Sequence, residues 1–444
     1  MEQIIGVFGI LVILGAIIVV HEFGHFIVAK ISGMLVHEFS IGFGPILFQW
    51  NKGGTAYSVR AVPLGGFVRI AGMEPNAEDE GDLAVKDNYE KKPFIAKFAT
   101  IFAGAFMNFV LAFIVIIIMG TVIGFPKEGD TVIVGGVAMN QPAHRAGLKT
   151  GDEFVSIAGQ QITDDDQVRP LIQKSKAPIA VVVKRKGELI SVQVTPVPQM
   201  VPGKDVFVDT IKPESEIYDA GLRNGDRIIS IAEQTVMNAA QADIFLKELT
   251  APAPMVIIRD RAEQTLKVNK TDKDVEFRNS FLYRMFEYRG IGIVIATTNG
   301  QWEHSSPQEA ITNGGIGVVN QLIDSVAQFA SIVSGRIPVK AMSGPVGIMQ
   351  GAYEASKSAV DNKLGLLNAL NLVALFSIAI GFFNLLPIPA LDGSRLVILT
   401  IEAIRRKPFD RNKEAIVHLV GLALLLAFVL YVTIFNDTAN IFRR

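Results

Sequence analysis

Two histidines and a glutamate stand near the end of the first apolar stretch of the chain. His21, Glu22 and His25 form the pattern H-E-x-x-H within "VVHEFGHFI", residues 19–27. On a helix His21 and His25 project from the same face, so both imidazoles can reach one metal ion. In such a site the metal, most often zinc, lowers the pKa of a water molecule, and the glutamate takes the proton as the water attacks a carbonyl. The pattern predicts His21 and His25 as zinc ligands and Glu22 as the catalytic base.

The candidate for a third ligand is Asp392, because a catalytic zinc usually has three protein ligands and an open position for water. The chain has no cysteine, so any metal must be held by His, Asp or Glu. Asp392 breaks the uncharged apolar run of "GFFNLLPIPALDGSRL", and Pro387 and Pro389 interrupt helical hydrogen bonding just before it. Irregular backbone at membrane depth is tolerated where it lines a buried site. An Asp-Gly turn at a helix end is the alternative interpretation.

The segments that carry these residues are apolar enough for a lipid bilayer. Half of the 444 residues are hydrophobic, and the mean hydropathy is +0.36. A membrane helix takes about 20 residues, and four stretches are long enough: residues 4–29, 98–125, 364–391 and 416–435. A secretory signal at the start is disfavoured, because Glu2 replaces the expected basic residue and no small-residue cleavage site precedes the His-Glu pair.

Polar side chains in such a segment need a physical reason. An ionisable side chain at mid-bilayer costs about 2.5 to 3.5 kcal/mol on insertion scales. Two histidines and a glutamate in the first span therefore need a compensating partner, and a metal ion supplies one. The alternative is a helix whose polar end only reaches the cytoplasmic headgroups.

Lys and Arg residues near the ends of the spans predict their orientation. They cluster in the loop after the first span and in "RRKPFDRNK", residues 405–413, so both loops are expected to face the cytoplasm. The first and third spans then run inward, which brings Asp392 to the same depth as His21 and His25. The N-terminus, the long segment between the second and third spans, and the C-terminus are expected on the outer side.

The outer segment contains an internal repeat. "AGLKTGDEFVSIAGQQI" (146–162) and "AGLRNGDRIISIAEQTV" (220–236) are offset by 74 residues, and each predicts a short helix, a Gly-Asp turn and a strand. The pattern resembles PDZ domains, at 127–200 and 201–292, which bind extended peptides at a sheet edge. "RGIGI" (289–293) resembles their carboxylate-binding loop. Two β-rich spacers without a ligand are the alternative.

The motifs together resemble a known family. "HEFGH" in the first span, "NLLPIPALDG" (384–393) in the third and two PDZ-like domains between them resemble the site-2 protease family of intramembrane zinc metalloproteases, and within it the bacterial proteases that regulate sigma-E. The resemblance implies that His21, His25 and Asp392 bind zinc, that Glu22 is the catalytic base, and that Asn384 contacts substrate. "SGPVGI" (343–348) also looks like a family segment, whereas no motif matches residues 293–342.

The same resemblance implies partners and location. The family's substrates are membrane helices already clipped on the outer side, including an anti-sigma factor and leftover signal peptides. We therefore expect a multi-pass protein of the bacterial inner membrane, with periplasmic PDZ-like domains and an active site near the cytoplasmic face. The PDZ-like pair is expected to act as a size filter that excludes substrates still carrying a bulky outer domain.

The expected fold is a polytopic α-helical membrane protein with four transmembrane helices, a membrane-associated β segment and two periplasmic PDZ-like α/β domains. An amphipathic helix at 318–333 is expected on the outer membrane surface or against the PDZ-like pair. The expected boundaries are transmembrane helices at 1–30, 94–125, 363–404 and 415–436, a β loop at 31–93, PDZ-like domains at 127–200 and 201–292, a linker at 293–362 and a cytoplasmic loop at 405–414.

The β loop suggests how a membrane helix could be opened for cleavage. A helical substrate hides its scissile carbonyls in hydrogen bonds, so the helix must unwind locally. "TAYSVRAV" (55–62) and "GGFVRI" (65–70) alternate like strands, and we expect the edge formed by 55–62 to pair with unwound substrate. A hairpin that only caps the site is the alternative.

Other classes of function are weighed against proteolysis. A net charge of −1 argues against a nucleic-acid partner. A membrane-anchored PDZ scaffold would explain the repeat but would not need Glu22 or Asp392. A zinc transporter would explain membrane histidines, yet its polar residues should continue across the bilayer, whereas those placed here gather near one face.

Overall fold

The computed structural model describes residues 2–73, 86–127, 129–138, 141–175, 177–260, 262–271, 274–290, 293–339, 344 and 363–437. The chain divides into two compact units. The helical unit comprises Met1–Pro126, Trp302–Ile323 and Ser343–Arg444, and the sheet unit comprises Lys127–Gln301 and Asp324–Met342. All the predicted site residues belong to the helical unit.

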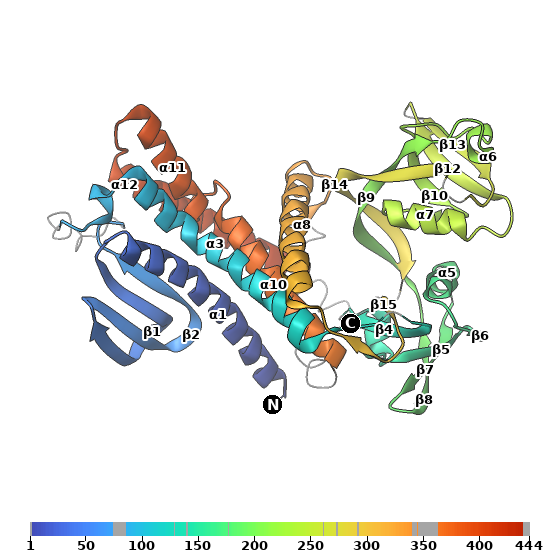
Figure 1. Ribbon diagram of the computed structural model, residues 1–444, viewed down its shortest axis with the longest axis horizontal. Coiled ribbons are helices and arrows are strands. Elements are labelled where there is room, and N and C mark those ends of the chain that lie inside the picture. The colour runs from blue at the N-terminus through green and yellow to red at the C-terminus, as the bar shows by residue number, and fades with distance from the viewer. Residues whose placement is uncertain are drawn as a thin grey trace. The chain divides into compact units, whose positions relative to one another are not determined.

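Three helices form the framework of the helical unit: α1 (Glu2–Ile31), α3 (Phe94–Ile118) and α10 (Lys363–Asn384). Helix α3 packs against both of the others (Figure 1). Small residues allow this close approach, since a Cβ on Gly24 of α1 would strike the carbonyl of Ala103, and one on Gly381 of α10 would lie 3.0 Å from the carbonyl of Ala105. The centre of α3 is therefore buried from two sides.

Among the described residues, five helices are long and apolar enough to cross a membrane. Four of them overlap the predicted spans, and the last of these is α12 (Arg411–Val432). The fifth is α8 (Pro307–Val333), for which the sequence predicts an amphipathic surface helix over 318–333. The helix begins eleven residues earlier than expected (307 against 318), which makes it long enough to count as a candidate span.

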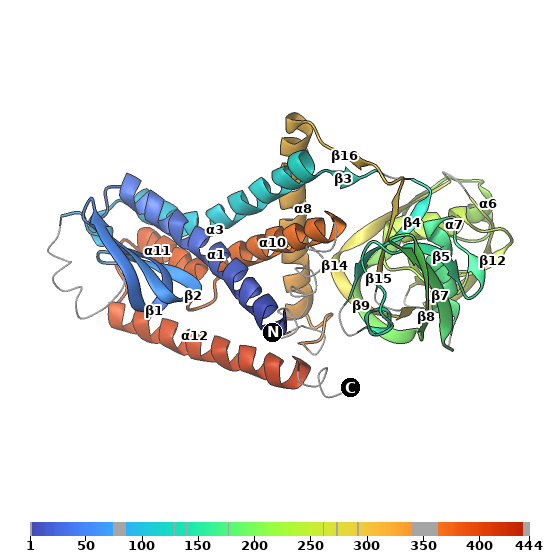
Figure 2. The same ribbon diagram turned by 90° about the horizontal axis from the view of Figure 1, so that it is seen from below.

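The predicted β segment is present as β1 (Val36–Lys52) and β2 (Thr55–Ile70), two long antiparallel strands joined at Gly53 and Gly54. Both glycines have positive φ values, 58° and 74°, as a tight two-residue hairpin turn requires. The pair lies against α1 (Figure 2), where a Cβ on Gly15 would strike the carbonyl of Pro63. The sheet is thus fixed to the helix that carries the H-E-x-x-H pattern.

The register of this sheet shows that the expected edge, residues 55–62, is wrong. Ser58 lies opposite Gln49 on one side and opposite Ser40 on the other, and its neighbours 56, 57 and 59 are likewise paired on both sides. Residues 66–70 pair with 36–41 on one side, and no described strand pairs with their other side. The edges are therefore 46–52 and 66–70, because each long strand folds back and pairs twice.

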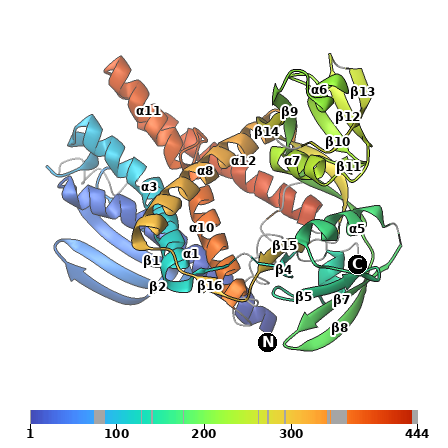
Figure 3. The same cartoon turned by 45° about the vertical axis from the view of Figure 1, so that its right-hand side comes forward.

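The sheet unit contains two antiparallel sheets with the same plan. The first has the strand order β15-β4-β5-β7-β8, with β6 beside β5, and the second has the order β13-β12-β10-β9-β14, with β11 beside β10. Helix α7 (Ala239–Lys247) packs against the second sheet (Figure 3). The strands are β4 (Thr131–Val137), β5 (Glu153–Ile157), β6 (Gln160–Gln161), β7 (Ile179–Arg185), β8 (Glu188–Val194), β9 (Val197–Ile211), β10 (Arg227–Ile231), β11 (Gln234–Thr235), β12 (Ala253–Arg259), β13 (Ala262–Val268), β14 (Val275–Gly290) and β15 (Ile293–Thr298).

The predicted repeat is confirmed down to single contacts. Arg185 donates to both carboxylate oxygens of Asp152 at 2.6 Å, and Arg259 donates to those of Asp226 at 2.7 and 2.5 Å. Each arginine also donates at 2.7 Å to the carbonyl of the glycine in its "AGL" segment. The hydrogen bond to its aspartate raises the pKa of each guanidinium above its usual value. The Gly-Asp turn therefore carries a buried aspartate that ties each copy together.

The boundaries between the two copies differ from a simple tandem order. Strand β15, which follows the second copy, pairs with β4 of the first, so the second copy is inserted before the last strand of the first. Part of the stretch that no motif matched thus completes the first sheet. Arg289 and Gly290 of the "RGIGI" segment lie on β14, opposite Pro198 and Val197. The rest of its glycine-rich part (291–292), like "SGPVGI" except for residue 344, lies outside the described residues.

Candidate active site and metal centre

Three polar side chains converge inside the helical unit. His21 and His25 come from α1, and Asp392 is the first residue of α11 (Asp392–Arg405). Oδ2 of Asp392 lies 3.0 Å from Nε2 of His21 and 3.1 Å from Nε2 of His25, and the two Nε2 atoms are 3.2 Å apart. Among the described residues this is the one group of three His, Asp or Glu side chains that could hold a metal ion. The structure thus brings the three predicted ligands together from positions 371 residues apart.

An irregular loop delivers Asp392 to this position. The expected transmembrane helix at 363–404 is interrupted, because α10 ends at Asn384, residues 385–391 are not helical, and α11 begins at Asp392. Pro387 and Pro389 cannot donate backbone hydrogen bonds, which accounts for the break. A Cβ on Gly393 would strike the carbonyls of Leu385 and Leu386, so the loop folds tightly against the start of α11. The loop therefore connects the end of α10 to Asp392, which is the first residue of α11.

The residues around the two imidazoles suit a zinc ion. Nδ1 of His25 donates to the carbonyl of Thr100 at 2.8 Å, which leaves the lone pair of Nε2 facing His21 and Asp392. A Cβ on Gly104 would strike the ring of His25 and lie 2.8 Å from Nε2 of His21, so only glycine leaves room for both rings. Two neutral imidazoles and one carboxylate form a ligand set that zinc accepts while a fourth position stays open.

Asn108 is a polar neighbour that the sequence analysis missed. It is fully buried on α3, its Nδ2 lies 3.4 Å from Nδ1 of His21, and its Oδ1 has no hydrogen-bond partner among the described residues. If His21 binds metal through Nε2, its Nδ1 carries the proton and needs an acceptor. The two ends of an amide exchange by a flip, and the flipped amide of Asn108 offers Oδ1 to that proton. A lone amide in the apolar run "AFMNFV" (105–110) was the available signal.

The predicted base, Glu22, lies between the metal-ligand candidates and the β sheet. It is half-buried, and its Oε2 accepts a hydrogen bond from the backbone N–H of Val68 at 3.2 Å. Val68 belongs to the edge 66–70, and that edge therefore runs beside the base. Asn384 is half-buried and is the last residue of α10, at the start of the loop that leads to Asp392.

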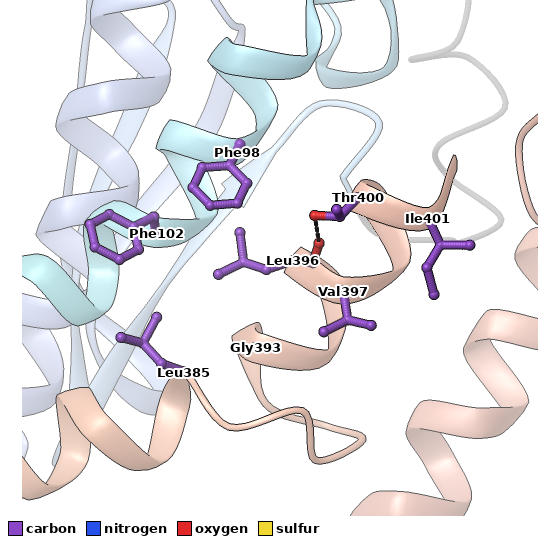
Figure 4. A pocket seen from close by; sticks show the side chains of 8 residues that line it. All are labelled: Phe98, Phe102, Leu385, Gly393, Leu396, Val397, Thr400 and Ile401. Carbon is purple, nitrogen blue, oxygen red and sulfur yellow. Dashed lines mark hydrogen bonds between the residues drawn. The ribbon is translucent and has the colours of Figure 1, made fainter. Parts of the chain in front are cut away.

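An apolar pocket of about 310 Å³ adjoins the residue after Asp392. Gly393 forms part of its wall, and the remaining side chains come from α3, the loop after α10 and α11 (Figure 4). Thr400 contributes a hydroxyl, but this donates to the carbonyl of Leu396 at 2.7 Å. The space beside the candidate site is thus shaped for apolar groups. The lining residues are Phe98, Phe102, Leu385, Gly393, Leu396, Val397, Thr400 and Ile401.

Comparison with known proteins decides the family. The sequence profile of peptidase family M50, the site-2 proteases, matches residues 9–428. The chain belongs to this family. It is similar to the regulator of sigma-W protease RasP of Bacillus subtilis, with 28% identity over 465 residues, covering 98% of this chain and 99% of that protein. It is also similar to zinc metalloprotease RasP of Geobacillus kaustophilus (26% identity, 99% of each chain) and to metalloprotease MmpA of Caulobacter vibrioides (26% identity, 96% and 94%).

Membership of M50 carries several conclusions. The chain is a zinc metalloprotease and a multi-pass membrane protein. The cluster of His21, His25 and Asp392 is its candidate metal centre. The membrane-anchored scaffold and the zinc transporter are therefore set aside.

Proposed function

We propose that this M50 protease hydrolyses a peptide bond within or near the transmembrane segment of membrane proteins that have already been trimmed on the outer side. His21, His25 and Asp392 bind the zinc, and Glu22 is the general base. The observation that carries the proposal is the convergence of one carboxylate oxygen on two imidazole nitrogens at 3.0 and 3.1 Å. No other group among the described residues offers such a ligand set.

The residues of this chain divide the work of the reaction. Zinc supplies Lewis acidity, lowering the pKa of a water molecule and polarising the scissile carbonyl. Glu22 follows His21 directly, takes the proton of the attacking water and passes it to the leaving amine. The N–H of Val68 holds one carboxylate oxygen of Glu22 and leaves the other free to accept that proton. The apolar walls around the site exclude bulk water and strengthen these electrostatic interactions.

We propose that unwound substrate adds as a strand to the edge 66–70. The support is twofold: this edge has no partner strand on its outer side among the described residues, and Val68 contacts the proposed base. Backbone hydrogen bonds from a sheet edge replace those that the substrate helix loses, which matters where water is scarce. Asn384, at the end of α10, is proposed to contact the same opened segment.

The positions of the three metal-ligand candidates on their helices bear on the number of membrane crossings. Asp392 comes after the C-terminal end of α10 and meets His21 and His25 in the C-terminal part of α1, so α1 and α10 cross the membrane in the same direction. With α3 returning between them, a further crossing by α8 would reverse α10 and carry Asp392 to the opposite face. We therefore propose four crossings, with α8 lying in or along the membrane surface, as its exposed apolar side chains allow.

The proposed substrates follow from the similarity to RasP. RasP of Bacillus subtilis is a regulator of sigma-W protease, and we propose an anti-sigma factor and leftover signal peptides as substrates here.

The proposed location, which follows from the positions of Lys and Arg, is the bacterial inner membrane, with the site near the cytoplasmic face and the sheet unit in the periplasm. The two repeated domains are proposed to be PDZ-like and to act as a size filter for trimmed substrates.

Replacing the base tests the proposed mechanism. Glu22→Gln keeps a side chain of the same size but cannot take the proton, so cleavage of a membrane-helix substrate should fall by at least about 100-fold. Zinc content of the purified protein should stay at the wild-type level, because Glu22 is not a ligand. Cleavage at the wild-type rate would rule out Glu22 as the base, and loss of zinc would show that it acts as a ligand instead.

A further inference from the structure

Helix α12 touches the rest of the helical unit along a narrow stripe. Helix α12 is exposed over most of its surface. Its buried or half-buried positions include Glu414, His418, Gly421, Leu425 and Val432, whose spacings of 4, 3, 4 and 7 place them on one face. The contacts made by the middle of this stripe therefore define what α12 does for the fold.

Those contacts are made with the loop that leads to Asp392. Nδ1 of His418 accepts a hydrogen bond from the backbone N–H of Ala390 at 3.0 Å. Gly421 packs so closely on Pro389 that a Cβ there would strike its ring and lie 2.9 Å from its backbone carbon and carbonyl oxygen. Both contacts fall within the three residues that precede the aspartate.

The conformation of this loop makes an external acceptor necessary. Ala390 has a φ of +79°, in the left-handed region that residues other than glycine rarely adopt. Its N–H makes no helical hydrogen bond, and an unsatisfied N–H is unfavourable at membrane depth. His418 supplies the acceptor, and because its Nδ1 accepts this hydrogen bond, the neutral ring carries its proton on Nε2, which lies 3.7 Å from Oε1 of Glu414.

We propose that His418 and Gly421 are positioning residues for the metal centre. They clamp Pro389 and Ala390 so that Asp392 is presented at a fixed place opposite His21 and His25. The fourth span thereby acquires a role in metal binding although it contributes no ligand. The proposal rests on the proposed ligand set but not on proteolysis, so it is tested by zinc binding itself.

The experiment measures how fast zinc leaves the detergent-purified full-length protein when an excess of chelator is added. His418→Leu keeps the bulk but removes the acceptor, and zinc should leave about tenfold faster, as for the loss of other groups that orient a ligand. His418→Gln offers an amide oxygen in its place and should return the rate to within about threefold of wild type. Gly421→Ala should also accelerate loss, because its methyl group displaces Pro389.

Two controls separate positioning from other causes. Leu419→Ala changes the neighbouring exposed side chain of α12 and should leave the rate unchanged. The inference is overturned if His418→Leu releases zinc at the wild-type rate, or if Leu419→Ala releases it as fast as His418→Leu does. Asp392→Ala is measured in parallel: if it too keeps its zinc, the proposed ligand set fails, and the role of His418 fails with it.

Discussion

At the scale of single residues, the metal centre depends on groups that hold the ligands as well as on the ligands. The carbonyl of Thr100 fixes the ring of His25 at 2.8 Å, and Asn108 lies 3.4 Å from the ring of His21. Both groups belong to α3, whose Gly104 also leaves room for the two rings. Helix α3 thus orients both histidines although it contributes no ligand. The longer of its two contacts, between Asn108 and His21, can be tested by substitution.

Asn108→Leu removes the acceptor while keeping the size of the side chain. Because Nδ1 of His21 then loses its partner, zinc affinity should fall by about 10- to 100-fold. Asn108→Asp keeps an acceptor and should stay close to wild type. Competition with a chelator of known affinity measures both, and Phe106→Leu, an exposed position on the same helix, is the matched control. Equal affinity of the Leu and Asp variants would mean that Asn108 only fills space.

The sequence predicted the ligand candidates but not their supports, for a physical reason. The helical spacing of His21 and His25 indicates their role, and so does the charge of Asp392 in an apolar run. Thr100 acts through its backbone carbonyl, and Gly104 acts by lacking a side chain, so the residue type does not indicate either role. Their roles appear only when α1 and α3 are seen in contact.

At the scale of elements, the β sheet beside α1 is the part that could open a substrate helix. Local alternation correctly predicted strands near 55–62 and 65–70, but it carries no information about which strand pairs with which. Because β1 and β2 both pair twice, residues 56–59 lie in the interior of the sheet and residues 66–70 lie at its edge. The edge 66–70 is also the one that contacts Glu22, through the N–H of Val68.

Val68→Pro removes an N–H from this edge and blocks strand addition there. Cleavage of a helical membrane substrate should slow by at least about tenfold more than cleavage of an unstructured peptide with the same scissile sequence. The ratio of the two rates is the measurement, because losing the contact to Glu22 alone would slow both substrates equally. An unchanged ratio would therefore dismiss strand addition at 66–70. Gln49→Pro, on the opposite edge, is the control and should leave the ratio as in wild type.

At the scale of the whole molecule, the repeated domains form a nested pair. The sequence predicted both copies from their shared Gly-Asp turns, and the aspartate of each turn pairs with an arginine of its own copy. It did not predict that β15 would return to the first sheet, because a strand's partner is fixed by the completed fold and β15 has no motif. The second copy therefore cannot be treated as a separate downstream module.

Removal of the pair tests the proposed size filter, and the nesting dictates where to cut. Deleting Lys127–Gln301 removes both sheets complete, whereas a cut at 292 would leave β15 without its partners. The shortened protein should cleave a substrate that still carries a folded outer domain, and the full-length protein should reject it. A substrate already trimmed, assayed alongside, shows whether the catalytic unit is still active. Continued rejection by an active deletion variant would contradict the filter.

The zinc content of purified wild-type protein beside Asp392→Ala tests the shared metal site most directly. We expect about one zinc per wild-type chain and, because two imidazoles alone hold the ion weakly, much less in the variant after dialysis against a mild chelator. Equal zinc in the two proteins would contradict the shared site of His21, His25 and Asp392, and with it the proposed mechanism.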